Sequence, residues 1–323
     1  ARRKDWDRLD QLSKASNLNG SEADELIELY QRSAADLSEI KANEASSVLG
    51  DWLSLVLSRA RITFTGTSRN LFSQLPEFFA AQLPAALYRV RWLSLAVTGV
   101  SILAALTCAL WALSNPEVLN SFGDKAALEK LVNEDFVNYY SDNPAASFMG
   151  LVWTNNAWIA AQCVAFGIVG VWVPYVMLQN ALNVGITGAI MFSYEKGDVF
   201  FQYILPHGML ELYAIFVAGG TGLFIFWSWI APGHRSRAES LAEAARSAFT
   251  IVIGLVIALL ISGIIEGFVT PQPWPWQLKI AIGAIAFLGF LLYQFWLGRR
   301  AWRAGFTGDL NRFDAGVSKI VAG

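Results

Sequence analysis

The sequence predicts an all-α protein, a polytopic bundle of transmembrane helices that follows a polar helical segment. Hydrophobic residues make up 54% of the 323 residues and charged residues 15%, and the mean hydropathy is +0.41. Soluble domains carry roughly 25% charged residues, so these charges are too few to cover a soluble surface. They are also unevenly placed, because residues 1–91 hold 12 Lys/Arg and 12 Asp/Glu and long uncharged runs follow. This distribution places the membrane domain after residue 91.

The same figures exclude several classes of protein. A soluble enzyme and a disordered chain do not fit the shortage of charge. A nucleic-acid binder does not fit a net charge of −2 and a sequence pI of 5.8. Both cysteines, Cys108 and Cys163, lie inside apolar runs, so we expect no disulfide framework.

Residues 1–91 are predicted to form cytosolic and interfacial amphipathic helices. The first helix covers 21–44, where Ser21 and Asp24 match a capping box and apolar residues recur at helical spacing. A second helix covers 46–61. The apolar segment 70–91 is interrupted by two prolines and is expected to lie at the interface before the first span. Because so small a bundle is marginal alone, we expect it to dock on the membrane or on a partner.

The transmembrane domain, 92–298, is predicted to cross the membrane six times, with about 20 apolar residues per crossing. Residues 143–194 carry no charge and are long enough for two helices, which Pro174 separates. The second of these is diluted by Asn and Gln side chains, so a re-entrant segment stays open as its alternative. The predicted spans are 92–113, 153–173, 178–194, 204–230, 247–269 and 280–298.

Arginine placement predicts the orientation, because Lys and Arg concentrate in cytoplasmic loops. The arginines form three clusters, at 89/91, 235/237/246 and 299/300/303. Six crossings put all three on one side of the bacterial plasma membrane, with both termini and the tail 299–323 in the cytoplasm. They put the acidic segment 114–150 outside.

Polar residues within the spans are the candidate functional residues, because such groups are costly in a bilayer. His207 and Glu211 are four residues apart and share one helix face, and Glu266 lies near the end of its span. With Asn155 and Asn156 they fall at one membrane level, and we predict that these five form one buried polar cluster. Such a cluster would hold helices together, carry a substrate or proton, or bind a lipid or partner. Two further polar residues, Asn180 and Asn183, are expected toward the inner face.

Small residues near this cluster predict tight helix packing. They are Gly219, Gly220 and Gly222 and the GxxxG pair Gly263 and Gly267. The same residues would also suit a homodimer.

Catalytic motifs are absent from the sequence. The chain has two histidines, no H-E-x-x-H, no G-x-S-x-G, no phosphate-binding or dinucleotide fingerprint, and no aspartate within the predicted spans. We therefore expect neither catalysis nor a metal or other cofactor.

Four short motifs carry a family resemblance. They are His207-Gly208-x-x-Glu211, Glu266 to Pro271, the Asn155-Asn156 pair with Asn180 to Gly185, and Ala218 to Gly222. With them the chain resembles the stage II sporulation protein M family of bacterial membrane proteins, also called the DUF95 family. Trp6, Leu9 and the helix 22–36 are similar to the long actinobacterial form.

The resemblance implies a polytopic protein without enzymatic activity. Relatives in spore formers act with peptidoglycan-hydrolysing partners, and those elsewhere are encoded near RDD-type membrane proteins, a MoxR-type ATPase and a DUF58 protein. The expected function is a scaffold or assembly component of the cell envelope. The alternative is a proton- or ion-coupled transporter or channel that uses the His/Glu cluster.

Overall fold

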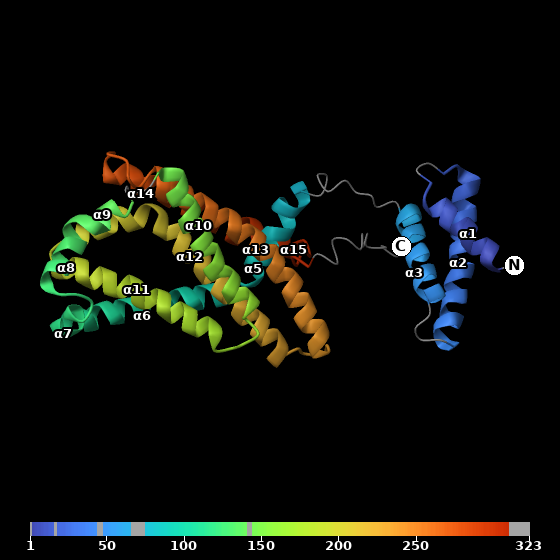
Figure 1. Cartoon of the computed structure of the whole chain (residues 1–323), viewed down its shortest axis with the longest axis horizontal. Helices are drawn as coiled ribbons and strands as arrows, with labels where there is room; N and C mark the ends of the chain where they lie inside the picture. The colour runs from blue at the N-terminus through green and yellow to red at the C-terminus, as the bar shows by residue number, and fades with distance from the viewer. Residues whose placement is uncertain (1, 16–17, 44–47, 66–74, 141–143, 310–323) are drawn as a thin grey trace. The chain divides into compact units, whose positions relative to one another are not determined.

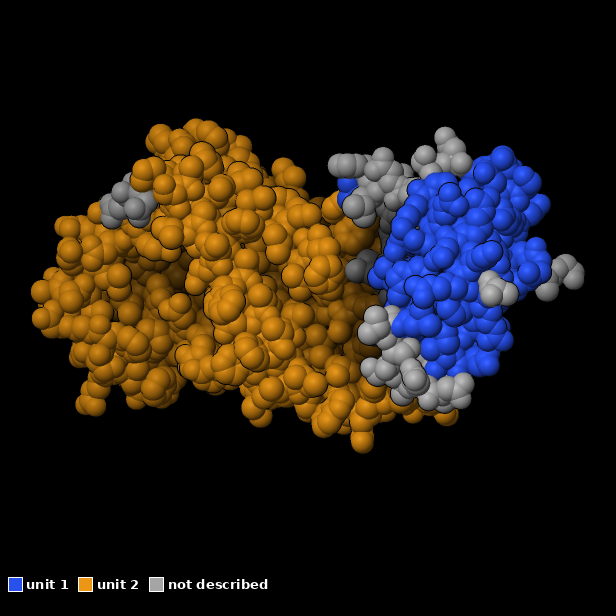
Figure 2. Space-filling model, turned by 45° about the vertical axis from the view of Figure 1, so that its right-hand side comes forward, with its two compact units in different colours: residues 1–76 blue, residues 77–323 orange. Residues whose placement is uncertain are grey.

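The computed structural model describes residues 2–15, 18–43, 48–65, 75–140 and 144–309. These residues form helices and loops without a strand (Figure 1), which confirms the all-α fold class. They divide into two compact units, Ala1–Pro76 and Glu77–Gly323, which Figure 2 shows in different colours. The sequence had placed this boundary at residue 91.

The first unit consists of three helices, α1 (Arg2–Ser13), α2 (Gly20–Asn43) and α3 (Val48–Thr65). Helix α1 was not predicted, because its apolar face is narrow and most of its residues are charged or polar. Leu9 of α1, Leu26 of α2 and Leu53 of α3 are fully buried against one another's helices and form the centre of the core. The unit therefore has a hydrophobic core of its own.

The start of α2 differs from the prediction. Asn19 caps the helix: its Oδ1 accepts a hydrogen bond from the Glu22 N–H at 2.9 Å, and Glu22 Oε2 accepts one from the Asn19 N–H at 3.0 Å. The capping box thus begins two residues before Ser21, because the helix starts at Gly20 and Ser21 already lies in its first turn.

A bidentate ion pair joins α1 to α2. Arg8 donates from Nε and Nη2 to the two carboxylate oxygens of Glu25, at 3.0 and 2.8 Å. These hydrogen bonds raise the pKa of Arg8 and lower the pKa of Glu25. In the same unit, Trp6 Nε1 donates to Asp36 at 2.9 Å, so the buried indole has a polar partner.

The second unit contains five helices that are long and apolar enough to cross a membrane. They are α6 (Arg91–Ser114), α11 (Trp172–Ser193), α12 (Gly197–Ile230), α13 (Arg237–Phe268) and the continuous helix Trp276–Arg303, which comprises α14 (Trp276–Leu292), η3 (Tyr293–Leu297) and α15 (Gly298–Arg303). Helix α11 is unbroken over 22 residues, which favours a full crossing over the re-entrant alternative.

A sixth helix of similar length, α10 (Ala145–Ala165), was predicted to cross but is less apolar than these five. Its polar residues Asn155, Asn156 and Gln162 lower its hydropathy. It packs against α12 and α13, and Leu151 and Trp158 on its outer side are each 64% exposed, as in a helix that faces lipid. The sixth crossing therefore stays a prediction that rests on α10.

Pro174 was predicted to separate two helices, but it lies inside the second of them. It occupies the first turn of α11, where a missing backbone N–H breaks no helical hydrogen bond. The chain turns instead at 166–171, so α10 begins and ends eight residues earlier than the predicted span 153–173.

The helix that precedes the first span packs on the membrane unit mainly through its second half, which is buried, whereas its first half is largely exposed, and its interfacial position stays a prediction. Its parts η1 (Phe78–Gln82) and α5 (Leu83–Arg89) pack on α13 and on the end of the last helix. Gln294 is fully buried there: its amide donates to the Leu87 carbonyl at 3.0 Å, and its oxygen accepts from Tyr213 at 2.7 Å.

The six long helices alternate in direction (Figure 1), so the loops gather at two opposite ends of this unit. At one end, Arg89 and Arg235 both bind Glu243, the first at 2.7 Å, and α15 packs on α5. All three arginine clusters are therefore at this end. The tail 299–323 is described only as far as Asp309, which binds Arg246 at 2.6 Å.

The opposite end carries the acidic segment between α6 and α10. It contains α7 (Pro116–Asn120), α8 (Lys125–Lys130), η2 (Leu131–Asp135) and α9 (Phe136–Asn138). Phe136 and Tyr140 are buried and contact the ring of Tyr203 on α12. This aromatic contact places the segment next to the His207 turn.

Candidate functional site

Three helices bring the polar residues of the membrane unit together. Helix α12 supplies His207 and Glu211, one turn apart, and α13 supplies Ser262 and Glu266 with the same spacing. Asn156 comes from α10, which packs on both. The two pairs face each other, because the Ser262 hydroxyl lies within hydrogen-bond distance of the His207 carbonyl at 3.1 Å and of Glu211 Oε2 at 3.2 Å.

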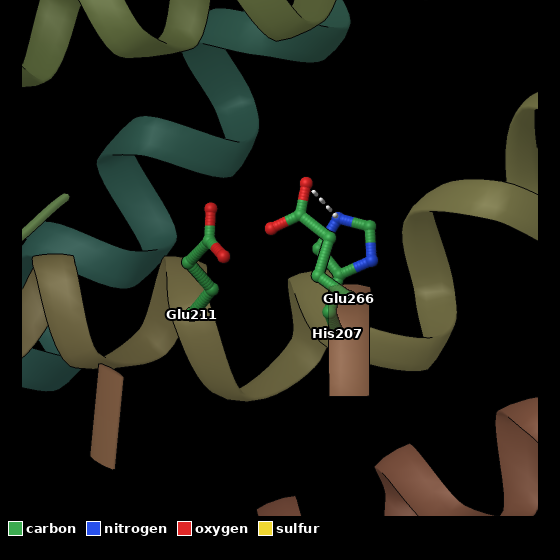
Figure 3. Close-up of side chains that lie close together, drawn as sticks. All are labelled: His207, Glu211 and Glu266. Atoms are coloured by element: carbon green, nitrogen blue, oxygen red, sulfur yellow. Dashed lines mark ion pairs between the residues drawn. The ribbon is translucent and has the colours of Figure 1, made fainter. Parts of the chain in front are cut away.

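The His207 and Glu266 side chains are in direct contact (Figure 3). Nε2 of the imidazole lies 3.7 Å from Oε1 of Glu266. Both residues are 4% exposed. Ring Nδ1 of His207 lies 3.4 Å from Thr270 Oγ1 on its other side, so both ring nitrogens face polar atoms.

Glu211 completes the cluster. Its Oε2 accepts a hydrogen bond from Ser262 at 3.2 Å, and the Asn156 side chain lies against the same carboxylate. Ligand-type atoms of His207, Glu211 and Glu266 all lie within 4.8 Å of one another. These three residues, which we call the His/Glu cluster, have the donor atoms and the proximity to hold a metal ion.

One buried oxygen in the His/Glu cluster lacks a partner. Oε2 of Glu266 has no hydrogen bond, although the residue is almost completely buried. In Figure 3 the Glu266 carboxylate lies between the imidazole and Glu211, and this second oxygen points toward Glu211. Buried polar atoms without partners are rare and costly, and they mark sites of function or of an absent ligand.

Tyr140 covers the cluster from the loop end. Its ring centroid lies 5.8 Å from that of His207, and the residue is 5% exposed. Burial raises the pKa of Tyr140, so its hydroxyl stays protonated at neutral pH. The neutral ring therefore packs on the imidazole without adding a charge to the cluster.

Lys279 is a neighbour of the cluster that was not predicted from the sequence. It lies in the first turn of α14 and is 6% exposed, and its Nζ donates to the backbone carbonyls of Thr270 and Gln272 at 2.8 and 3.2 Å. It thereby ties the start of α14 to the turn that follows α13. The sequence did contain a signal for this residue, because Lys279 is the only Lys or Arg between Arg246 and Arg299.

The structure brings four of the five predicted cluster residues together and leaves one outside. Asn155 is exposed, and its amide reaches only the neighbouring Asn156, at 3.4 Å. The reason is helical spacing: adjacent residues are about 100° apart around α10, so only one of the pair can face α12.

Asn180 and Asn183 lie away from the His/Glu cluster and nearer the middle of the membrane unit than predicted, because α11 starts six residues earlier than the expected span. They line a cavity of about 1100 Å³ together with Gln179 and Thr187 and with residues of α6, α7 and α8. Asn180 also donates to the Val176 carbonyl at 3.0 Å. The cavity thus extends from these amides to the acidic loop segment.

The predicted packing glycines differ in how tightly they are enclosed. A Cβ at Gly220 would lie 2.7 Å from the Ser94 backbone, and one at Gly267 would lie 2.8 Å from the Ala145 carbonyl. A Cβ at Gly222 would overlap the Cys163 carbonyl, and one at Gly219 would lie 3.0 Å from Met177. Gly263 has room for a methyl group, since its nearest neighbour would be 3.4 Å away.

Comparison with known proteins divides the chain in the same way as the structure. A family model described as stage II sporulation protein M matches residues 94–271, which include the whole His/Glu cluster. A second model, described as a domain of unknown function (DUF8413), matches residues 1–66, within the first unit. No curated protein and no solved structure matches the chain. Since the first model covers more than half of the sequence, this multi-pass membrane protein belongs to the stage II sporulation protein M family.

Proposed function

We propose that this chain is a non-enzymatic component of the bacterial plasma membrane that serves as a scaffold or assembly partner in the cell envelope. The separate N-terminal unit carries this proposal. It has its own hydrophobic core and its own family model, and it is joined to a membrane unit whose polar centre is enclosed. A folded helical unit attached to a membrane bundle is an arrangement suited to recruiting a partner.

Its orientation follows from the arginine end of the membrane unit. Arg89, Arg235 and the arginines of α15 lie at one end, and the positive-inside rule makes that end cytoplasmic. With α10 as the sixth crossing, both termini lie in the cytoplasm and the acidic loop segment lies outside. Single-cysteine labelling at Ser236 and at Ser121 tests this: a membrane-impermeant thiol reagent is expected to label only the second in intact cells.

Enclosure of the His/Glu cluster also favours a scaffold. Among the residues that the structure describes, none of the four main cavities is lined by His207, Glu211 or Glu266. A transport pathway needs access from at least one face. The polar residues instead join α10, α12 and α13, where each hydrogen bond between helices contributes about 1 kcal/mol or less.

Co-purification tests the scaffold proposal. The native complex is solubilised in mild detergent, and its composition is compared with that of a chain whose N-terminal core is disrupted by Leu53→Asp. We expect stoichiometric partners only with the intact unit, with RDD-type membrane proteins, a MoxR-type ATPase and a second copy of the chain as those to look for. A chain that purifies alone from both preparations refutes the proposal.

The second candidate function is proton- or ion-coupled transport, and one observation favours it. Two carboxylates and an imidazole lie side by side in the membrane unit, and one carboxylate oxygen has no partner. The test is a pH-gradient-driven flux in proteoliposomes, with Glu211→Gln as the variant. If the wild type supports such a flux and Glu211→Gln abolishes it, the transporter function is correct and the scaffold function is refuted.

A further inference from the structure

The His/Glu cluster holds two carboxyl groups side by side in the membrane unit, and no Lys or Arg of the described part of the chain pairs with either of them. His207 Nε2 lies 3.7 Å from Glu266 Oε1, and this contact is an ion pair only when the imidazole is protonated. The nearby ammonium of Lys279 is already engaged by two backbone carbonyls. Buried carboxylates without a compensating cation are strongly unfavourable, so the site needs either protons or a bound cation.

The donor atoms match a transition metal better than an alkaline-earth ion. One imidazole nitrogen with two carboxylate oxygens is a set typical of zinc and manganese, whereas calcium and magnesium prefer oxygen alone. The Nδ1 side of His207 faces Thr270 Oγ1 at 3.4 Å, which orients the ring and leaves Nε2 toward the carboxylates.

The spacing requires only small side-chain movements. Ligands of a tetrahedral zinc ion lie about 3.3 Å apart, and His207 Nε2 and Glu266 Oε1 are already 3.7 Å apart. The widest separation in the cluster is within 4.8 Å, so Glu211 has to move in by about 1.5 Å at most. The unpartnered Oε2 of Glu266 faces the space that an ion would occupy.

We propose that His207, Glu211 and Glu266 bind one divalent transition-metal ion, through Nε2 of the histidine, one oxygen of Glu211 and both oxygens of the Glu266 carboxylate. The ion neutralises both carboxylates and gives the orphaned oxygen a partner. Because its ligands come from α12 and α13, it clamps these two helices together beneath Tyr140. This inference goes beyond the scaffold function and holds whichever of the two candidate functions is correct.

Metal content tests the proposal. The full chain is purified in detergent, stripped with a chelator and titrated with Zn²⁺ and separately with Mn²⁺, and bound metal is measured by mass spectrometry. We expect one ion per chain for the wild type and a loss of affinity of at least about tenfold for His207→Gln, Glu211→Gln and Glu266→Gln. The matched control is Glu129→Gln, because that carboxylate is exposed in the loop segment and pairs only with Lys125, so this variant should bind as the wild type does.

A stability measurement separates loss of the site from loss of the fold. In the stripped state, Glu266→Gln should unfold at the same temperature as the wild type or higher, since it removes a buried charge. Added Zn²⁺ should raise the unfolding temperature of the wild type and of Glu129→Gln, but not that of the three glutamine variants of the cluster. Glu266→Asp keeps a carboxylate and should retain weakened binding even if the glutamine variant does not fold.

Two results overturn the metal site. One is a stripped wild type that binds neither ion at millimolar concentration, which makes the cluster a protonated, hydrogen-bonded one. The other is binding that the three cluster substitutions leave unchanged, which places the ion elsewhere. Neither result bears on the scaffold function, which the co-purification experiment tests separately.

Discussion

Gly283→Ala tests how α14 is held against the His/Glu cluster. Gly283 is buried on α14, and a Cβ added there would fall on the carbonyl oxygen of Pro206, far inside the 3.0 Å that real Cβ atoms keep. Pro206 directly precedes His207 in α12. A methyl group at 283 must therefore push one helix backbone away from another at the turn that carries the histidine.

The expected magnitude follows from two opposing terms. Overpacking a close contact costs about 1–3 kcal/mol, and the upper half of that range applies because a backbone carbonyl cannot rotate away. Replacing glycine with alanine inside a helix returns about 1 kcal/mol. We therefore expect a net destabilisation of about 1–2 kcal/mol.

Gly289→Ala is the matched control. It lies on the same helix and a Cβ there would meet no atom within 4 Å, so only the gain in helix propensity applies. Reversible unfolding in mixed micelles, followed by tryptophan fluorescence, compares the free energies of unfolding of the two variants with that of the wild type. If Gly283→Ala is as stable as Gly289→Ala, the close packing of α14 on Pro206 is wrong.

Two further predictions concern polar contacts. Tyr213→Phe leaves the buried oxygen of Gln294 without a donor and should lower the free energy of unfolding in micelles by about 1–2 kcal/mol. The control is Tyr175→Phe, whose side chain is exposed, and it should change the free energy of unfolding by less than about 0.5 kcal/mol. Equal effects of the two variants would refute the buried network. In the first unit, the hydrogen bonds from Arg8 lower the pKa of Glu25, so this carboxylate stabilises the fold above its unfolded pKa and ceases to do so as the pH falls through its folded pKa. Carboxyl carbon shifts in NMR should show Glu25 titrating below the usual range, and Arg8→Gln should move that titration upward; a titration that does not move would mean that the ion pair does not form in solution.

Several features of the candidate site were predictable from sequence because they depend on spacing along one helix. His207 and Glu211 share a face of α12 for that reason, and the predicted level of Glu266 follows from the alternation of spans. Lys279 and the aromatic cover of Tyr140 were not predictable in this way. Both belong to segments outside the predicted spans, and their roles arise from where the loop end folds back on α12 and α13.

Helix ends were the least predictable part of the fold. Hydropathy marks the apolar part of a span, but α12 and α13 extend beyond their apolar parts. The start of α11 was ambiguous because a proline can either end a helix or occupy the first turn of one, and Pro174 does the second. In the same way, Asn19 rather than Ser21 caps α2, and the sequence did not distinguish them because both residue types are good N-caps.

Composition and charge placement were sufficient for the class of protein, because the energy of transfer to a bilayer is a property of residue types summed over a segment, and four short motifs were sufficient for the family. The functional geometry depended on the folded chain. Whether Asn155 or Asn156 enters the cluster, whether Glu266 has a partner for both oxygens, and which glycine supports a helix crossing are all set by the rotation and separation of packed helices. These are properties of pairs of packed helices, and they cannot be derived from the pattern of residues along the sequence.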